Sequence, residues 1–316
     1  MWHAATQVDP VWILVIVFVS VPLLYLRGWR WQALMKPVAA VRLQTATEAV
    51  AVGYVANLVI PRSGEILRAY RVHSTSEAST LSLMATVVLE RMLDVVLLLL
   101  SGVVAMLLVP ERLNDQYPWL TTALAGSCLV LLAVVATILL LWILLRRCET
   151  GNDSGVVARP LARIVDWTVK AASQFTTGFD VIAKPSAYAG IFAMSLLLYF
   201  GYAGVIYLSF HAMGIESTEG PLGFDAAVVV MFMALIGTVI PTPGATGSYH
   251  FFFAETLHVL YGVPLVSALA CATVLHALNN LLCIVISVPC LDQYVRSKRL
   301  DSRSVRSEHG GRFSGQ

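Results

Sequence analysis

The stretch Asn57-Leu58-Val59-Ile60-Pro61-Arg62-Ser63-Gly64-Glu65 ends a hydrophobic segment with proline, glycine and charged residues. A second interruption follows in the other half of the chain, at Pro241-Thr242-Pro243-Gly244-Ala245-Thr246-Gly247-Ser248-Tyr249-His250. We call these stretches the first break and the second break. Irregular backbone is tolerated at membrane depth only where it is buried in protein or lines a cavity. Paired breaks in the two halves of a chain are typical of a transporter's binding site.

The composition is that of a membrane protein. Of the 316 residues, 58% are hydrophobic and 13% are charged, whereas soluble domains carry about 25% charged residues. The sequence therefore predicts an all-α, polytopic membrane protein. Its hydrophobic helices, about eight in number, are expected at 11–35, 46–60, 80–109, 121–145, 187–211, 224–240, 249–262 and 264–291. Because residues 1–10 contain no Lys or Arg, we expect the first segment to be a retained helix rather than a signal peptide.

The basic residues predict an orientation. Four regions, at 27–42, 61–79, 146–184 and from 292 onward, hold 19 of the 21 Lys and Arg. The positive-inside rule places these regions in the cytoplasm, with the N-terminus outside and the C-terminus inside. The residues 27–42 are interpreted here as one basic loop that contains Arg27 and Arg30.

This orientation has a consequence for the two breaks. Residues 43–60 start and finish on the basic side, so we expect them to be re-entrant from the cytoplasm. Residues 224–262 are expected to re-enter from outside, which is the relation that an inverted repeat requires. The alternative is that 46–60 crosses the membrane completely and that the loop at 61–79 violates the positive-inside rule.

We expect one transmembrane domain over residues 1–295. Its first half covers about 10–145, a cytoplasmic surface helix covers about 155–180, and its second half covers about 187–291. Residues 296–316 are rich in Ser, Arg and Gly, and they are predicted to form a basic, disordered cytoplasmic tail. A weak internal similarity aligns 88–94 with 274–280, so that Glu90 matches His276 and Asp94 matches Asn280.

Glu90, Arg91 and Asp94 are ionisable residues in the middle of a hydrophobic segment. They lie about 15 Å into a helix that begins near Leu81, close to the centre of a bilayer core about 30 Å thick. Each costs about 2.5–3.5 kcal/mol there, so they must be paired or face water. Arg91 can reach Asp94 at the i, i+3 spacing. Two interpretations stay open: a substrate-binding site, or a buried ion cluster that holds this helix against the first break.

The first break offers Arg62, Gly64, Glu65 and Arg68 as substrate-binding residues. A helix that resumes after Pro61 points free N–H groups toward its N-terminus, which favours an anion. Arginine binds phosphate in a bidentate manner. The alternative interpretation of Arg68 is an ordinary charge of a cytoplasmic loop.

The second break contains no Lys or Arg, and its candidate residues are neutral: Ser248 and His250, with His276 and Asn280 on the following helix. Such a site suits the passage of a polar headgroup that must not be trapped. A histidine in a membrane helix is also found as an ordinary interhelical hydrogen-bonding residue.

Enzyme signatures are absent from the sequence: there is no G-x-S-x-G, H-E-x-x-H, P-loop or G-x-G-x-x-G motif. The histidines and acids show no repeated metal-binding spacing. We therefore expect no enzymatic activity, no catalytic residues, no metal and no cofactor. The five cysteines form no C-x-x-C pair and are interpreted as small apolar residues.

At these positions the chain resembles the lysylphosphatidylglycerol synthase transmembrane-region family of flippase-like membrane proteins. The resemblance covers about residues 10–290 and rests on Asn57, Pro61, Gly64-Glu65, Arg68, Glu90-Arg91, Asp94, Pro241-x-Pro243-Gly244 and Gly247. It implies an integral lipid translocase of the bacterial cytoplasmic membrane, and it adds Asn57, Pro243 and Gly244 to the expected site. The best-known members move aminoacylated phosphatidylglycerol, and relatives are linked to polyprenyl-phosphate lipids.

The sequence departs from that family in two ways. The soluble aminoacyl-transferase domain has no counterpart in these residues, so synthesis of lysyl-lipid is not expected. Many members have glycine where this chain has Ala245, and an acid soon after the second break, where this chain has Tyr249-His250.

The leading hypothesis is a flippase for an anionic or aminoacylated phospholipid, or for a polyprenyl-phosphate-linked lipid. Its partners would be that lipid and no nucleic acid; a homo-oligomer and a separate lipid-synthesising enzyme stay open. One alternative is a proton-coupled transporter of a small anion that uses His250 or Glu90. Another is a non-transporting accessory subunit of a lipid-modifying enzyme.

Overall fold

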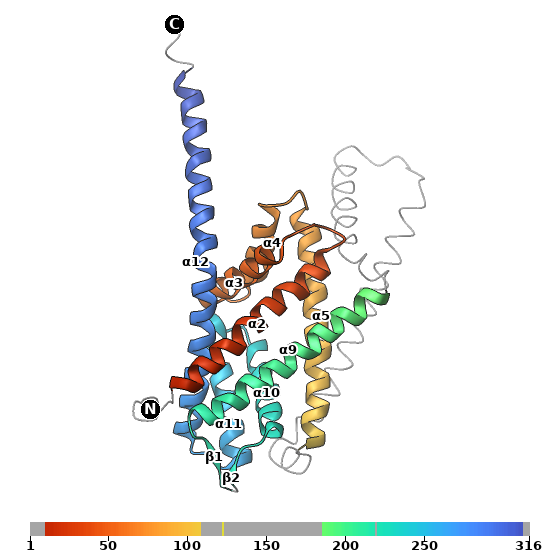
Figure 1. Ribbon diagram of the computed structural model, residues 1–316, viewed down its shortest axis with the longest axis vertical. Helices are drawn as coiled ribbons and strands as arrows, with labels where there is room; N and C mark the ends of the chain where they lie inside the picture. Colours follow the sequence, from red (N-terminus) through yellow and green to blue (C-terminus); the bar gives the residue numbers. More distant parts are fainter. Residues whose placement is uncertain (1–9, 109–121, 123–184, 219, 312–316) are drawn as a thin grey trace.

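The structure, a computed structural model, describes residues 10–108, 122, 185–218 and 220–311 (Figure 1). The helix predicted at 121–145 and the surface helix predicted at 155–180 lie outside the described residues. Every other predicted hydrophobic segment coincides with a helix whose ends agree to within a few residues, apart from the C-terminal end of the last helix.

The same order of elements occurs twice: a long helix, two short helices and a second long helix. The first set is α2 (Pro10–Met35), α3 (Leu43–Val59), α4 (Ser63–His73) and α5 (Thr80–Leu108). The second set is α9 (Pro185–Ala212), α10 (Phe224–Val239), α11 (Ser248–Tyr261) and α12 (Leu265–Gly311). A two-residue antiparallel pair, β1 (Glu216–Ser217) with β2 (Gly220–Pro221), precedes α10, and the 3₁₀ turn η2 (Pro243–Ala245) precedes α11.

Each pair of short helices forms a hairpin with a break at its tip. In the first hairpin, a Cβ added to Gly64 would lie 2.0 Å from the Gly53 carbonyl oxygen, so α3 and α4 are in backbone contact. In the second, a Cβ added to Gly237 would lie 2.7 Å from the Ser248 carbonyl oxygen, so α10 and α11 also approach through their backbones. Glycine is required at such close approaches because it has no side chain.

The corresponding long helices of the two sets run in opposite directions (Figure 1). In that view α5 runs downward and α12 upward, and α2 and α9 pack against each other with opposite directions. The α3–α4 hairpin lies in the upper part of the molecule and the α10–α11 hairpin in the lower part.

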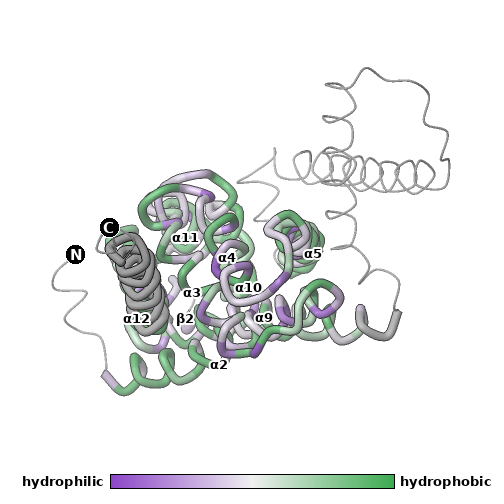
Figure 2. The backbone as a smooth tube through the Cα atoms, turned by 90° about the horizontal axis from the view of Figure 1, so that it is seen from above, coloured by the Kyte–Doolittle hydropathy of each residue, from purple (hydrophilic) through white to green (hydrophobic). Residues whose placement is uncertain are grey.

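Four of the described helices are long and apolar enough to cross a membrane: Pro10–Met35, Thr80–Leu108, Tyr188–Ala212 and Leu265–Val288. Large apolar side chains such as Phe18 and Phe200 are exposed on them, and Figure 2 colours long stretches of α2 and α5 as hydrophobic. At 17 residues for α3 and 16 for α10, the short helices fall below the length of a span. The predicted all-α, polytopic membrane fold is confirmed.

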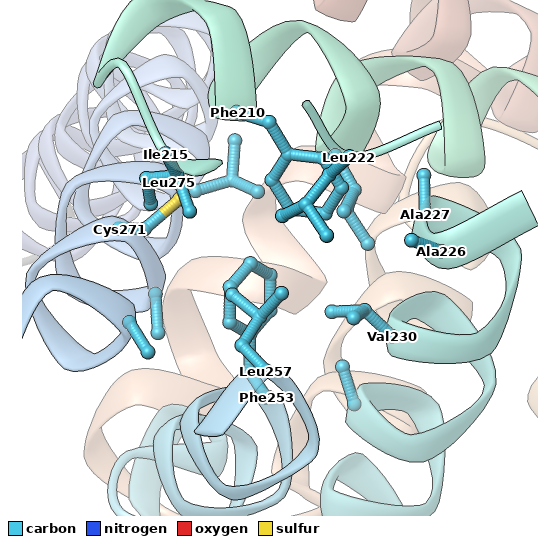
Figure 3. Packing of buried hydrophobic residues seen from close by; sticks show 14 of the residues in the cluster. Phe210, Ile215, Leu222, Ala226, Ala227, Val230, Phe253, Leu257, Cys271 and Leu275 are labelled. Carbon is cyan, nitrogen blue, oxygen red and sulfur yellow. The ribbon is translucent and has the colours of Figure 1, made fainter. Parts of the chain in front are cut away.

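Each set of helices has its own hydrophobic core. The core of the second set includes Phe210, Val230, Phe253 and Cys271, whose side chains converge from α9, α10, α11 and α12 in Figure 3. The core of the first set joins α2, α3, α4 and α5, and it also includes Ile191 of α9 and Cys283 of α12. A third cluster packs α5 against α10 and α11 and so connects the two sets.

The predicted disordered tail does not match the structure, because α12 continues to Gly311. Residues 291–309 contain no Pro or Gly. A helix already formed in the membrane can propagate into such a segment, since the unfavourable nucleation step is complete.

Candidate functional site

An ionic cluster lies where α2, α4 and α5 meet. It consists of Arg27, Arg30, Arg68, Glu90, Arg91 and Asp94. Helix α3 packs closely against α2 at this point: a Cβ added to Gly28, between the first two arginines, would lie 2.2 Å from the Thr47 hydroxyl oxygen of α3. The two acids lie one turn apart on α5 and so share a face of that helix.

Glu90 is the centre of the cluster, and its side chain is 0% exposed. Its carboxylate oxygens lie 2.8 Å from Arg30 Nη2 and 2.6 Å from Arg68 Nη1. Arg91 Nη2 is 3.3 Å away and Arg27 Nε is 3.8 Å away. A buried carboxylate is stable only when it is paired, and here four guanidinium groups surround it.

Asp94 lies at the more open side of the cluster. Its carboxylate lies 2.7 Å from Arg30 Nη2 and 3.0 Å from Arg91 Nη2, the i, i+3 contact that the sequence predicted. The side chain of Asp94 is 22% exposed and that of Arg91 is 33% exposed. The phenol of Tyr199 on α9 donates a hydrogen bond to the backbone carbonyl of Asp94, at 2.9 Å.

Aromatic and hydroxyl side chains fix the orientation of the arginines. Arg27 donates to the hydroxyl of Tyr54 on α3 and to that of Tyr202 on α9. The Arg68 guanidinium carbon lies 4.8 Å from the ring centroid of Trp31, a favourable cation–π distance. Arg30 Nη1 donates to the Ser195 hydroxyl at 3.3 Å. The cluster is therefore held by five helices, α2, α3, α4, α5 and α9.

The charges of the cluster do not cancel. Four guanidinium groups face two carboxylates, which leaves a formal excess of two positive charges; among the described residues, no other carboxylate pairs with these arginines. Within the same part of the chain, the buried Nε atoms of all four arginines and Nη2 of Arg68 have no hydrogen-bond partner. Unpaired buried donors cost free energy, so the arrangement is suited to receive an anion.

The interpretation of Arg27 and Arg30 as charges of a cytoplasmic loop is wrong. Both lie within α2, and Arg30 is 1% exposed. The signal was present in the sequence: the two arginines are three residues apart, which puts them on one helix face, and they lie inside the hydrophobic segment 11–35. Charges in such a segment require partners, and the acids on α5 supply them.

At the tip of the first hairpin, a side chain of the protein itself accepts the hydrogen bond of a backbone N–H at the start of α4. The backbone N–H of Gly64 donates to Asn57 Oδ1 at 2.7 Å, so this N–H is not free for an anion, contrary to the prediction. An N-terminal N–H of a helix is satisfied by any nearby side-chain oxygen, and Asn57 lies within reach. Glu65 forms no ion pair among the described residues, and its buried Oε2 has no hydrogen-bond partner there. It lies outside the ionic cluster.

The two tips touch. Arg62 has a left-handed φ of 65°, and its Nη2 donates to the Val239 carbonyl at 2.7 Å, which links the first break to the end of α10. Gly244 has a φ of 57°, and a Cβ there would lie 2.6 Å from Leu58 Cδ2. Leu58 lies one helical turn, about 6 Å along α3, beyond Tyr54, whose hydroxyl accepts a hydrogen bond from Arg27 of the ionic cluster.

The neutral residues of the second break form a separate group. The hydroxyls of Thr242 and Ser248 are 3.0 Å apart. The rings of His250 and His276 stack with centroids 4.9 Å apart and an interplanar angle of 16°, and Tyr249 meets His276 edge-on. Asn280, one turn further along α12, is half-buried. The structure thus brings His276 to the second break, whereas Glu90 and Asp94 lie in the ionic cluster.

No group of three or more His, Cys, Asp or Glu among the described residues is arranged to hold a metal ion.

These features define a helical membrane protein in which two broken hairpins meet beside a buried ionic cluster. Residues 1–287 match the family model described as the lysylphosphatidylglycerol synthase TM region. The chain belongs to this family, and it is an integral membrane protein with a membrane lipid-related domain. No curated protein sequence matches the chain.

Proposed function

We propose that the protein is a lipid translocase, which moves the polar headgroup of an anionic membrane lipid between leaflets while the acyl chains stay in the bilayer. The family assignment supports a role with membrane lipids. The observation that carries the proposal is the contact of the two hairpin tips beside the ionic cluster. Broken helices that meet near the bilayer midplane are the usual form of a transporter site.

The proposal includes a membrane topology. Both ends of the α3–α4 hairpin lie on the cytoplasmic side, and both ends of the α10–α11 hairpin lie on the opposite side. The opposite directions of α5 and α12, and of α2 and α9, are what an inverted repeat requires (Figure 1). The distribution of Lys and Arg supports a cytoplasmic C-terminus.

In this mechanism the ionic cluster attracts the phosphate of the headgroup, and the neutral second break lets it pass without binding it tightly. The tips separate to open a path and close again behind the headgroup. No covalent bond is made or broken, so the chain needs no catalytic residue for this step. In this proposal Glu65, close to the first tip, would accept a hydrogen bond from an amino or hydroxyl group of the headgroup, because its buried Oε2 has no hydrogen-bond partner among the described residues.

Reconstituted vesicles test the proposal. Purified full-length protein is inserted into vesicles that contain a fluorescently labelled phosphatidylglycerol, a labelled phosphatidic acid or a labelled polyprenyl phosphate. A membrane-impermeant quencher then reports which headgroups have changed leaflet. We expect accelerated movement of at least one of these lipids relative to protein-free vesicles. The proposal fails if no labelled lipid moves faster in vesicles in which the protein is verified to be folded and inserted.

A further inference from the structure

We infer that the ionic cluster selects lipids whose headgroup carries two negative charges at a terminal phosphate, over singly charged, zwitterionic or aminoacylated headgroups. This inference rests on the proposed function and names the substrate class of the same site. The ligand chemistry is a phosphomonoester or diphosphate, as in phosphatidic acid or a polyprenyl phosphate.

The charge balance of the cluster is the first argument. Arg27, Arg30, Arg68 and Arg91 face only Glu90 and Asp94. An uncompensated charge in a low-dielectric interior is costly. A ligand with two negative charges neutralises the whole excess of two positive charges. A phosphodiester carries one negative charge and neutralises half of it. A lysyl ester of phosphatidylglycerol carries a net positive charge and would increase the imbalance.

The unpaired donors are the second argument. All four guanidinium groups meet at Glu90, and five of their nitrogen atoms are buried without a hydrogen-bond partner among the described residues. A terminal phosphate offers three oxygens that are not bridged to carbon, and a phosphodiester offers two. Arginine recognises such oxygens in pairs because its N–H groups form a planar fork.

Access to the cluster is the third argument. Glu90 and Arg30 are almost completely buried, but the Arg91 and Asp94 side chains are 33% and 22% exposed. Arg91 pairs with both acids and is the most exposed of the four arginines. A headgroup would therefore meet Arg91 first and displace part of its pairing with Asp94.

Binding of defined lipids to the purified full-length protein in detergent tests the selection. The affinities of phosphatidic acid, phosphatidylglycerol and lysyl-phosphatidylglycerol with identical acyl chains are compared by native mass spectrometry, together with a polyprenyl monophosphate and inorganic phosphate. We expect the two phosphomonoester lipids to bind about tenfold or more tightly than phosphatidylglycerol, and lysyl-phosphatidylglycerol to bind most weakly. Raising the pH from about 6 to about 8 should strengthen the binding of phosphatidic acid and of the polyprenyl monophosphate but not that of phosphatidylglycerol, because the second ionisation of a terminal phosphate lies in that range.

Three variants assign the effect to the cluster. Arg91→Gln lowers the excess charge and should reduce the preference for phosphatidic acid over phosphatidylglycerol, whereas Asp94→Asn raises the excess charge and should increase that preference. Lys36→Gln removes an exposed cation outside the cluster and should change nothing. Since a substitution can alter folding, the ratio of two lipid affinities on the same preparation is the readout rather than either affinity alone.

The outcomes separate the two proposals. If phosphatidylglycerol binds as tightly as phosphatidic acid, or if Arg91→Gln weakens all lipids equally, the selection is wrong, while lipid movement in vesicles would leave the translocase intact. If inorganic phosphate binds as tightly as the phosphomonoester lipids, the site takes a soluble anion and the assignment to a lipid is overturned. If no lipid moves in vesicles, the translocase itself fails.

Discussion

Ala245 and Arg62 occupy backbone conformations that residues with a Cβ avoid, with φ angles of 57° and 65°. Such conformations cost about 1–2 kcal/mol for a non-glycine residue. Both lie at hairpin tips, and Arg62 is held there by its hydrogen bond to Val239. The φ angle of Ala245 is one that glycine adopts without this cost.

Replacing Ala245 by glycine should therefore stabilise the protein, by about 1 kcal/mol. The midpoint of thermal unfolding in detergent should rise. The matched control is Ala277→Gly, at an exposed position inside α12, where glycine should cost about 1 kcal/mol. A lower midpoint for both variants would show that the strain at Ala245 has no effect on stability.

Glu90→Gln should be strongly destabilising, by about 3–5 kcal/mol, because it leaves buried guanidinium groups without their central counter-charge. The measurement is the same unfolding midpoint, together with the yield of monodisperse protein. Glu77→Gln changes an exposed acid outside the cluster and should stay within about 0.5 kcal/mol. Equal effects of the two substitutions would contradict a structural role for the cluster.

At the scale of elements, glycines at the helix contacts allow each hairpin to close. Gly53 and Gly64 let α3 and α4 touch through their backbones, and Gly237 does the same for α10 and α11. These contacts compensate for the low helix propensity of glycine. They also place Arg68, one turn beyond Gly64, next to Glu90 on α5.

Gly64→Ala should force α3 and α4 apart, since the added Cβ would lie 2.0 Å from the Gly53 carbonyl oxygen. We expect a loss of about 3 kcal/mol and reduced lipid binding, because Arg68 moves with α4. Gly190→Ala has nothing within 4 Å of its Cβ, and it should be neutral or stabilising by up to about 1 kcal/mol. Similar unfolding midpoints for the two variants would refute the close contact.

At the scale of the whole molecule, the two helix sets meet at several places. These include the cluster that packs α5 against α10 and α11, the hairpin tips, and the packing of α2 on α9 and of α3 on α12. Interfaces between packed cores tend to switch between discrete arrangements rather than deform continuously. Relative movement of the two sets is therefore the motion that we expect to open and close the path.

The topology can be measured with single cysteines in a chain that lacks its five native ones. Lys36→Cys and Ser74→Cys flank the first hairpin, and Glu216→Cys precedes the second. If the first hairpin is re-entrant, an impermeant thiol reagent should label positions 36 and 74 from the same side of the membrane and position 216 from the other. Labelling of 36 and 74 from opposite sides would mean that α3 crosses completely.

A disulfide between the tips tests whether they must separate. Leu58→Cys with Gly244→Cys, in the same cysteine-free chain, places two side chains within bonding reach. Oxidation should stop lipid movement in vesicles, and a reductant should restore it. Each single cysteine variant should be insensitive to the oxidant. Unchanged movement after verified cross-linking would show that transport does not require the tips to part.

The amino-acid sequence by itself determined the helical membrane fold, the two breaks and the importance of Glu90, Arg91 and Asp94. These follow from local rules: hydrophobic length, the backbone limits of proline and glycine, and the cost of charge in a bilayer. The contact of Arg91 with Asp94 was predictable for the same reason, because its spacing lies within one helix.

Only the tertiary structure decided which charges meet. Arg27 and Arg30 come from α2 and Arg68 from α4, and each is separated in sequence from Glu90 by more than twenty residues. Asn57 takes the Gly64 N–H, and Arg62 reaches Val239 in the other half of the chain. Such contacts depend on how helices cross, which no local pattern encodes, because any paired arrangement satisfies the same requirement that buried charges be compensated.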